Sequence, residues 1–153
     1  MFDSQSGTVI GNQIPAITQS LDILYSKNDV STRQNLIDYV ETELASLQDD
    51  WDGHGGCAID KDALEHTLFI FNQLPISVLK YVDKDDILPT ANGTITVEWH
   101  NSKNELLLDI GKNNATYYIQ NQGHTEKINN HFDVSDGEQM QTFIRELNQY
   151  FLD

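Results

Sequence analysis

Residues 94–120 decide the fold, and they read T-I-T-V-E-W-H-N-S-K-N-E-L-L-L-D-I-G-K-N-N-A-T-Y-Y-I-Q. Apolar and polar side chains alternate in three short runs of this stretch, a pattern typical of strands with one buried face. The runs predict strands at Thr94–Trp99, Leu106–Ile110 and Ala115–Gln120. The connections are rich in Asn, Ser, Gly and Lys, so we expect hairpin turns and an antiparallel sheet. A fourth strand is expected at about Thr125–Ile128.

Two helices are predicted before the sheet, each from apolar residues at helical spacing and a capping signal. Ser31 and Gln34 form a capping box at the start of a helix that we place at Thr32–Leu47. Asp60 is a natural N-cap for a second helix at Lys61–Gln73, which should end before the next proline. These helices should pack as a hairpin, with the loop between them exposed at one end.

A third helix is predicted from Ser135, which forms a capping box with Glu138, to the end of the chain. Its apolar stripe consists of Met140, Phe143, Ile144, Leu147 and Phe151. We expect this stripe to pack on the sheet. The alternative is a partner or homodimer surface, because the helix lies at the chain end.

The first residues carry weaker signals. Met1–Asn12 is rich in Gly, Ser, Gln and Asn and predicts a flexible tail, while Pro15–Tyr25 has helical spacing. No repeat or long linker divides the chain. We therefore expect residues 1–153 to form a single α+β domain, with N-terminal helices, an antiparallel three- to four-stranded meander and a C-terminal helix packed on one sheet face.

The charge balance restricts the classes of partner. Asp and Glu number 24 against nine Lys and Arg, which gives a formal net charge of −15 and a pI near 4.4. The nine basic residues are scattered singly along the chain. Direct binding to nucleic acid or to an anionic membrane is therefore disfavoured. The first interpretation of the charge is that it keeps the protein soluble, and the main alternative is a basic protein partner.

The cysteine content and the N-terminus predict a cytoplasmic location. Cys57 is the only cysteine, so an internal disulfide is impossible, as is usual in a reducing compartment. The N-terminus lacks a basic start followed by an apolar run, and no segment has the roughly 20 apolar residues of a membrane helix. We expect a soluble protein.

The loop at Asp49–Ala58 reads D-D-W-D-G-H-G-G-C-A and concentrates polar groups around one tryptophan and three glycines. Clustered carboxylates suit a divalent cation, but the spacing does not match an EF-hand. A phosphate loop is disfavoured because no Lys-Ser/Thr pair follows the glycines and the nearby carboxylates repel phosphate. The prevailing interpretation is structural: the aspartates accept hydrogen bonds from loop amides while Trp51 packs on the core.

A second group of candidates lies on the sheet. Glu98 is on the strand face opposite Trp99, and we expect Asp109 and Tyr118 on the same face as Glu98. His131 is assigned to a loop. The candidate partner- or ligand-binding residues are Asp49, Asp50, Trp51, Asp52, His54, Glu98 and Trp99. We assign no catalytic residue, no metal ligand and no cofactor, and Cys57 is interpreted as a small, partly buried thiol.

Two stretches resemble a known group of sequences when taken together. They are W-D-G-H-G-G-C-A-I at Trp51–Ile59 and L-P-T-A-N-G-T-I-T-V-E-W at Leu88–Trp99. They resemble small, largely uncharacterised bacterial proteins that carry a WDG-x-G-A-type loop after a helix and a later P-x-x-x-G-x-I-x-x-E-W strand. The resemblance covers roughly residues 36–118 and implies a bacterial accessory protein, without an activity. The step Gly56-Cys57-Ala58 departs from the usual small-residue pattern, so the resemblance assigns Cys57 no role.

Three functional hypotheses follow. The first is an acidic bacterial interaction protein, antitoxin-, immunity- or inhibitor-like, that binds a basic protein partner. The second is a small enzyme or metal-dependent site at the Asp49–Cys57 loop. The third is a ligand-sensing module in which Trp51 and Trp99 line an apolar cleft.

Overall fold

The computed structural model describes residues 31–121 and 127–151. Two compact units are distinguished, Met1–Thr32 and Arg33–Asp153, and nearly all the described residues belong to the second. The tail predicted at Met1–Asn12 and the helix predicted at Pro15–Tyr25 lie outside the described residues.

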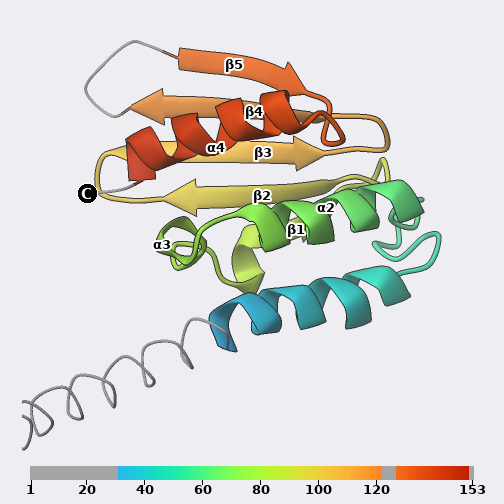
Figure 1. Ribbon diagram of the computed structural model, residues 1–153. Helices are drawn as coiled ribbons and strands as arrows, with labels where there is room; N and C mark the ends of the chain where they lie inside the picture. The colour runs from blue at the N-terminus through green and yellow to red at the C-terminus, as the bar shows by residue number, and fades with distance from the viewer. Residues whose placement is uncertain (1–30, 122–126, 152–153) are drawn as a thin grey trace, which may run out of the picture. The chain divides into compact units, whose positions relative to one another are not determined.

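The second unit is built on a five-stranded antiparallel sheet in which each strand pairs with the next one in the sequence (Figure 1). The strands are β1 (Ile87–Pro89), β2 (Ile95–His100), β3 (Asn104–Ile110), β4 (Ala115–Asn121) and β5 (Lys127–Phe132). In the central register Trp99 lies opposite Leu106, which lies opposite Ile119, and all three are buried. The alternation of side chains thus forms one continuous apolar face, and the predicted α+β meander is confirmed.

The sheet differs from its prediction at both edges. β1 was not predicted, because three residues ending in proline show neither alternation nor a β-rich run. The last strand is also displaced: it extends to Phe132, so His131 lies in β5 opposite Thr116 and its assignment to a loop is wrong. The sheet therefore has five strands rather than three or four.

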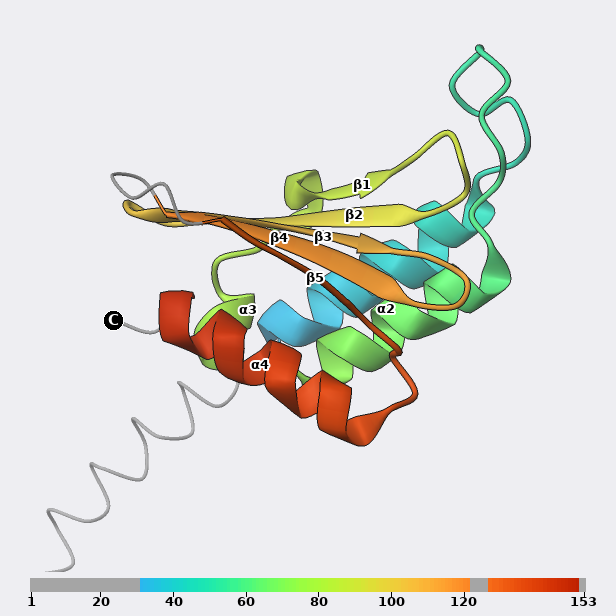
Figure 2. The same ribbon diagram turned by 90° about the horizontal axis from the view of Figure 1, so that it is seen from above.

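The helices lie on one side of this sheet (Figure 2). They are a leading helix whose described part is residues 31–42, α2 (Lys61–Gln73), the short α3 (Ile76–Leu79) and α4 (Gly137–Phe151). Two 3-10 turns, η1 (Leu44–Ser46) and η2 (Lys84–Asp86), complete the unit. One core cluster contains Leu36 of the leading helix, Phe71 of α2, Phe143 of α4 and the inward residues of the sheet. The open face of the sheet carries the outward residues.

The leading helix is shorter than predicted at its end and does not start at the predicted cap. Its α-helical turns end at residue 42 and the chain continues into η1, so the predicted helix to Leu47 is two elements. Ser31 is itself helical, and the Gln34 amide donates to Asp38 Oδ1 at 2.7 Å. The capping box predicted there is therefore wrong, because Gln34 bonds one turn forward instead of back to Ser31.

α2 has the predicted bounds and is held at both ends. Asp60 Oδ1 accepts from Asp62 N at 2.9 Å, which satisfies one of the free amides of the first turn. At the other end the Arg33 guanidinium donates to the carbonyl oxygens of Phe71 and Leu74. The predicted hairpin is confirmed, because Arg33, in the first described turn of the leading helix, bonds the C-terminal end of α2.

The capping residue of α4 lies one position later than predicted. Asp136 Oδ1 accepts from Glu138 N at 3.0 Å and from Gln139 N at 3.1 Å, so Asp136 is the capping residue. Ser135 donates its hydroxyl to Asp133 Oδ1 at 2.6 Å and caps nothing. The predicted Ser135–Glu138 box is wrong because an equally good capping residue stands one position further on.

Most of the apolar stripe of α4 is buried in the core. Phe143 stacks on Phe132 of β5 with ring centroids 4.8 Å apart, and it meets Tyr117 of β4 at 4.9 Å. Leu147 and Phe151 have no exposed surface. Most of the stripe thus packs in the core as expected, and Ile144 is partly buried beside it.

Among residues 31–121 and 127–151, no helix is long and apolar enough to cross a membrane.

Candidate interaction surface

The Asp49–Ala58 loop is attached to the turn between β1 and β2. Cys57 N donates to Ala91 O and Asp60 N donates to Gly93 O, both at 2.9 Å. Gly93 has φ 82°, and a Cβ there would lie 2.9 Å from Ala58 O. The two motifs that carry the sequence resemblance therefore meet in space, and the glycine of the second permits the close approach of the first.

The carboxylates of Asp49 and Asp50 hold the loop together. Each accepts a backbone amide across the loop: Asp49 Oδ1 from Ala58 N at 2.9 Å, and Asp50 Oδ1 from Gly55 N at 2.8 Å. Asp50 itself has φ 65°, a conformation that aspartate tolerates better than most residues. The two acids thus act as internal acceptors within the loop.

Asp52 has the same role at the tip. Its Oδ1 accepts from His54 N and Gly56 N, both at 2.9 Å. These two amides lower the pKa of the Asp52 carboxyl, because they stabilise its ionised form. A Cβ on Gly56 would lie 2.8 Å from Asp52 Oδ2, so a larger residue there would displace the Asp52 carboxylate.

The remaining polar groups of the loop are exposed but do not converge. The imidazole Nδ1 of His54 lies 2.8 Å from Asp52 O, and Cys57 is an exposed free thiol rather than a partly buried one. No hydrogen bond joins the Cys57 sulfur to a histidine in the described part of the chain. Within residues 31–121 and 127–151, no group of three or more His, Cys, Asp or Glu side chains is arranged to hold a metal ion.

Trp51 is fixed at the edge of a surface groove. Its indole Nε1 donates to Cys57 O at 2.9 Å, and the ring is half-buried. The groove, of about 370 Å³, lies between the leading helix, η1 and β1, and its lining includes Tyr39, Leu47 and Pro89. A rigid aromatic ring beside aliphatic side chains is a surface suited to a flat or long apolar group.

Two carboxylates stand near this groove on different elements. Glu43 lines it, and Asp85 belongs to η2. Partial burial raises the pKa of the Tyr39 phenol, and the negative charges of Glu43 and Asp85 raise it further. Both carboxylates therefore act on the same phenol. Neither makes a side-chain hydrogen bond or ion pair within the described residues.

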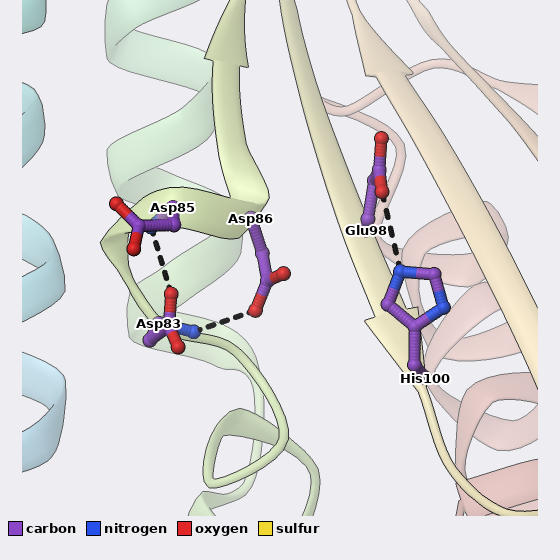
Figure 3. A network of polar contacts seen from close by, with 5 residues as sticks. All are labelled: Asp83, Asp85, Asp86, Glu98 and His100. Atoms are coloured by element: carbon purple, nitrogen blue, oxygen red, sulfur yellow. Dashed lines mark hydrogen bonds and ion pairs between the residues drawn. The ribbon is translucent and has the colours of Figure 1, made fainter.

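Neighbouring acids extend along η2 and β2 (Figure 3). Asp83 Oδ1 accepts from Asp85 N at 2.8 Å, while Asp86 Oδ2 accepts from Asp83 N at 2.9 Å, which closes a capping box on η2. On β2, Glu98 Oε1 lies 3.2 Å from His100 Nε2. Asp85 is therefore the member of the η2 group whose carboxylate is not used internally.

The open sheet face contains Glu98, Asp109 and Tyr118, on three adjacent strands. Asp109 Oδ1 accepts from Thr94 Oγ1 at 2.8 Å. Leu107, between Glu98 and Tyr118 in the register, is 42% exposed. The open sheet face therefore carries acidic, aromatic and aliphatic side chains together. Carboxylates are also found on the helices and in the loop, so they are not confined to this face.

Trp99 lies in the core and not at a surface. It has no exposed area, and its indole Nε1 donates to Val78 O at 3.1 Å. A ligand beside Trp51 could not touch it, so the hypothesis of one cleft lined by Trp51 and Trp99 is wrong. The physical reason is that β2 directs Trp99 toward the helices while Trp51 stays at the loop edge.

Several residues at the groove were not among the candidates predicted from the sequence. These are Tyr39, Glu43 and Pro89, which line the groove, and Asp85, whose charge acts on Tyr39. Tyr39 and Glu43 are four residues apart, so they lie on one helix face, and this spacing was the available signal. Nothing local connects them to Pro89, because that contact depends on β1.

No protein-family model, curated protein or solved structure matches this chain.

Proposed function

We propose that the protein is an acidic bacterial interaction protein, antitoxin-, immunity- or inhibitor-like, which binds a basic protein partner in the cytoplasm. The observation that carries the proposal is the excess of carboxylates without a cationic partner. Among the described side chains, Glu65 pairs with Lys61, and Glu98 contacts His100, which is cationic only when protonated. The full sequence has a net charge of −15, and within residues 31–121 and 127–151 most of the negative charge is available to an oppositely charged surface.

The alternative of an enzyme or metal site in the Asp49–Cys57 loop has less support. The carboxylates of Asp49, Asp50 and Asp52 each have an oxygen bonded to loop amides. Such bonds explain the loop as a structural unit without a reaction. A catalytic or metal site would need groups that converge on a common point, and among the described residues no three His, Cys, Asp or Glu side chains are placed to hold a metal ion.

Affinity capture at two ionic strengths tests the proposal. The full-length protein is immobilised, exposed to a bacterial lysate at about 50 mM salt and then washed at about 500 mM, since surface charge pairs are strongly screened at the higher value. The captured protein is identified, purified and titrated by calorimetry. We expect a partner of basic pI whose Kd rises at least tenfold between the two salt concentrations.

A matched control separates charge from non-specific adsorption. An unrelated acidic protein of similar pI is immobilised in parallel, and only proteins absent from that control are counted. A chelator is included in a third arm. A partner of acidic pI, a salt-independent Kd, or loss of binding on chelation would contradict the proposal.

A further inference from the structure

We propose that the groove beside Trp51 receives an arginine side chain of the basic partner. This inference rests on the proposed function and names the contact by which it operates. The groove has three features that match a guanidinium on an aliphatic stem: a fixed aromatic ring, aliphatic walls, and the negative charges of Glu43 in its lining and of Asp85, which acts on Tyr39.

The aromatic ring is that of Trp51, in the Asp49–Ala58 loop, and Tyr39 of the leading helix also lines the groove. The bond from Trp51 Nε1 to Cys57 O fixes the plane of the indole, and the ring remains half-exposed. A planar cation stacks on such a ring with favourable electrostatics, and tryptophan is the strongest of the aromatic side chains in this respect. Little side-chain entropy is lost on binding, because the indole is already held.

The aliphatic walls are supplied by Leu44, Leu47 and Pro89. The volume of about 370 Å³ lies near the lower end of the range for ligand pockets, roughly 300–1,000 Å³. A space of this size suits one long side chain and its flanking backbone. The stem of an arginine can pack on the walls while its charged head reaches the edge.

The carboxylates are Glu43, which lines the groove, and Asp85 of η2, whose charge reaches the Tyr39 phenol in the groove wall. They come from different elements, act together on the Tyr39 phenol and have no internal hydrogen bond within the described residues. The loop aspartates differ from them, because their oxygens already bind amides. A guanidinium has five donors in a planar fork and can satisfy two carboxylates at once, whereas an ammonium is a single point charge. This difference selects arginine over lysine.

The test uses defined peptides and the two indole signals of the protein. Acetylated peptides with six Gly-Arg, Gly-Lys or Gly-citrulline repeats are titrated into the ¹⁵N-labelled full-length chain at about 150 mM salt. Citrulline keeps the shape of arginine and lacks its charge. Trp51 and Trp99 are the only tryptophans, so each indole N–H gives one resolved signal and Trp99 is an internal reference.

We expect the Gly-Arg peptide to shift the Trp51 indole signal and leave that of Trp99 in place. Its Kd should be at least about tenfold lower than that of the citrulline peptide and about threefold lower than that of the lysine peptide. Equal affinity for arginine and lysine peptides, or a saturated complex with no movement of the Trp51 signal, would overturn the proposal.

A matched pair of variants distinguishes the groove from diffuse charge. Glu43→Gln and Glu41→Gln each remove one negative charge, the first just after the end of the leading helix and the second in its last turn, but Glu41 lines a different groove, with Lys61 and Leu64. Glu43→Gln should raise the Kd for the Gly-Arg peptide about fivefold, and Glu41→Gln less than twofold. Equal effects of the two variants would contradict the assignment. Both side chains are exposed, so neither change should alter folding, which circular dichroism checks.

The captured partner separates the two proposals. If no salt-dependent basic partner is found, the proposed function fails. If a partner binds the Glu43→Gln and Asp85→Asn variants as tightly as the wild type, the interaction stands and the arginine site fails.

Discussion

Three glycines in the Asp49–Ala58 loop, in the β1–β2 turn and in α4 differ in how strictly the structure requires glycine. Gly93 and Gly53 both have positive φ, 82° and 71°, but only Gly93 has a neighbouring atom where a Cβ would be placed. Gly137, the first residue of α4, has no such neighbour and ordinary backbone angles. Alanine would thus meet neither problem at Gly137, backbone strain alone at Gly53, and both backbone strain and a steric contact at Gly93.

We predict a graded series of stabilities for alanine at these glycines. Gly137→Ala should be neutral or slightly stabilising, because alanine is the better helix former. Gly53→Ala should lower the free energy of unfolding by about 1 kcal/mol through the left-handed backbone. Gly93→Ala should lower it by more than ~2 kcal/mol, since the Ala58 carbonyl must also move. Urea denaturation measures all three. Equal losses at Gly53 and Gly93 would show that the contact with Ala58 is unimportant.

Tyr117 is a buried residue whose ionisation should be visible in stability. Its hydroxyl donates to Glu146 Oε2 at 2.6 Å, and burial together with this bond raises its pKa to about 12. In the unfolded chain a tyrosine ionises near pH 10. The stabilisation is therefore complete below pH 10 and is lost as the pH rises toward 12, because only the unfolded state ionises in that window.

We predict that the free energy of unfolding falls by roughly 2 kcal/mol between pH 10 and 12 and that Tyr117→Phe removes most of this fall. Urea denaturation at several alkaline pH values, beside an absorbance titration of the phenols, measures the effect. Tyr118→Phe, on the open sheet face, is the control and should retain the fall. A steep loss that persists in Tyr117→Phe would assign it to another group.

At the scale of elements, the sequence predicted best where a signal acts locally. Asp60 at one end and Pro75 beyond the other fixed α2 to the residue. The strands β2, β3 and β4 followed from alternation, whose period is a property of the backbone itself. Where two capping residues stand together, as Ser135 and Asp136 do, the choice between them depends on the tertiary path of the chain.

Other elements depend on contacts that no local pattern contains. β1 exists because Ile87 and Pro89 find partners on β2, and its three residues have no strand signal of their own. The groove beside Trp51 was not predictable for the same reason, since Pro89 of β1 forms one of its walls. The loop aspartates were identified from composition, but their donors depend on how the loop closes.

The end of α2 offers a test at the element scale. Arg33 donates to the carbonyl oxygens of Phe71 and Leu74, so it satisfies acceptors that the helix leaves free and places a positive charge at its C-terminus. Arg33→Met keeps the stem and should lower the free energy of unfolding by about 1–2 kcal/mol. Thermal and urea denaturation measure it. Arg145→Met is the control, because Arg145 is exposed on α4, and it should change stability by less than about 0.5 kcal/mol.

At the scale of the whole molecule, charge is the dominant property. A net charge of −15 makes the surface carboxylates repel one another, which favours the partner proposed above and opposes the compact state. Screening by salt should therefore strengthen folding while it weakens association with a basic protein. The two responses to salt have opposite signs.

We predict that the midpoint of thermal unfolding rises by roughly 2–4 °C between about 20 and 500 mM sodium chloride. A double variant, Glu41→Gln with Glu105→Gln, removes two exposed charges and should show a smaller rise. Differential scanning calorimetry at several salt concentrations measures it. A midpoint that falls with salt would mean that favourable ion pairs outweigh the repulsion.

The order of the sheet has a kinetic consequence. Every strand pairs with its neighbour in sequence, so each pairing closes only a short segment and loses little chain entropy. The bonds from Cys57 to Ala91 and from Asp60 to Gly93 are different, because they join segments separated by all of α2, α3 and β1. We expect the sheet to assemble early and the Asp49–Ala58 loop to dock after the rate-limiting step. Mutations at this docking should accordingly accelerate unfolding and leave the folding rate unchanged.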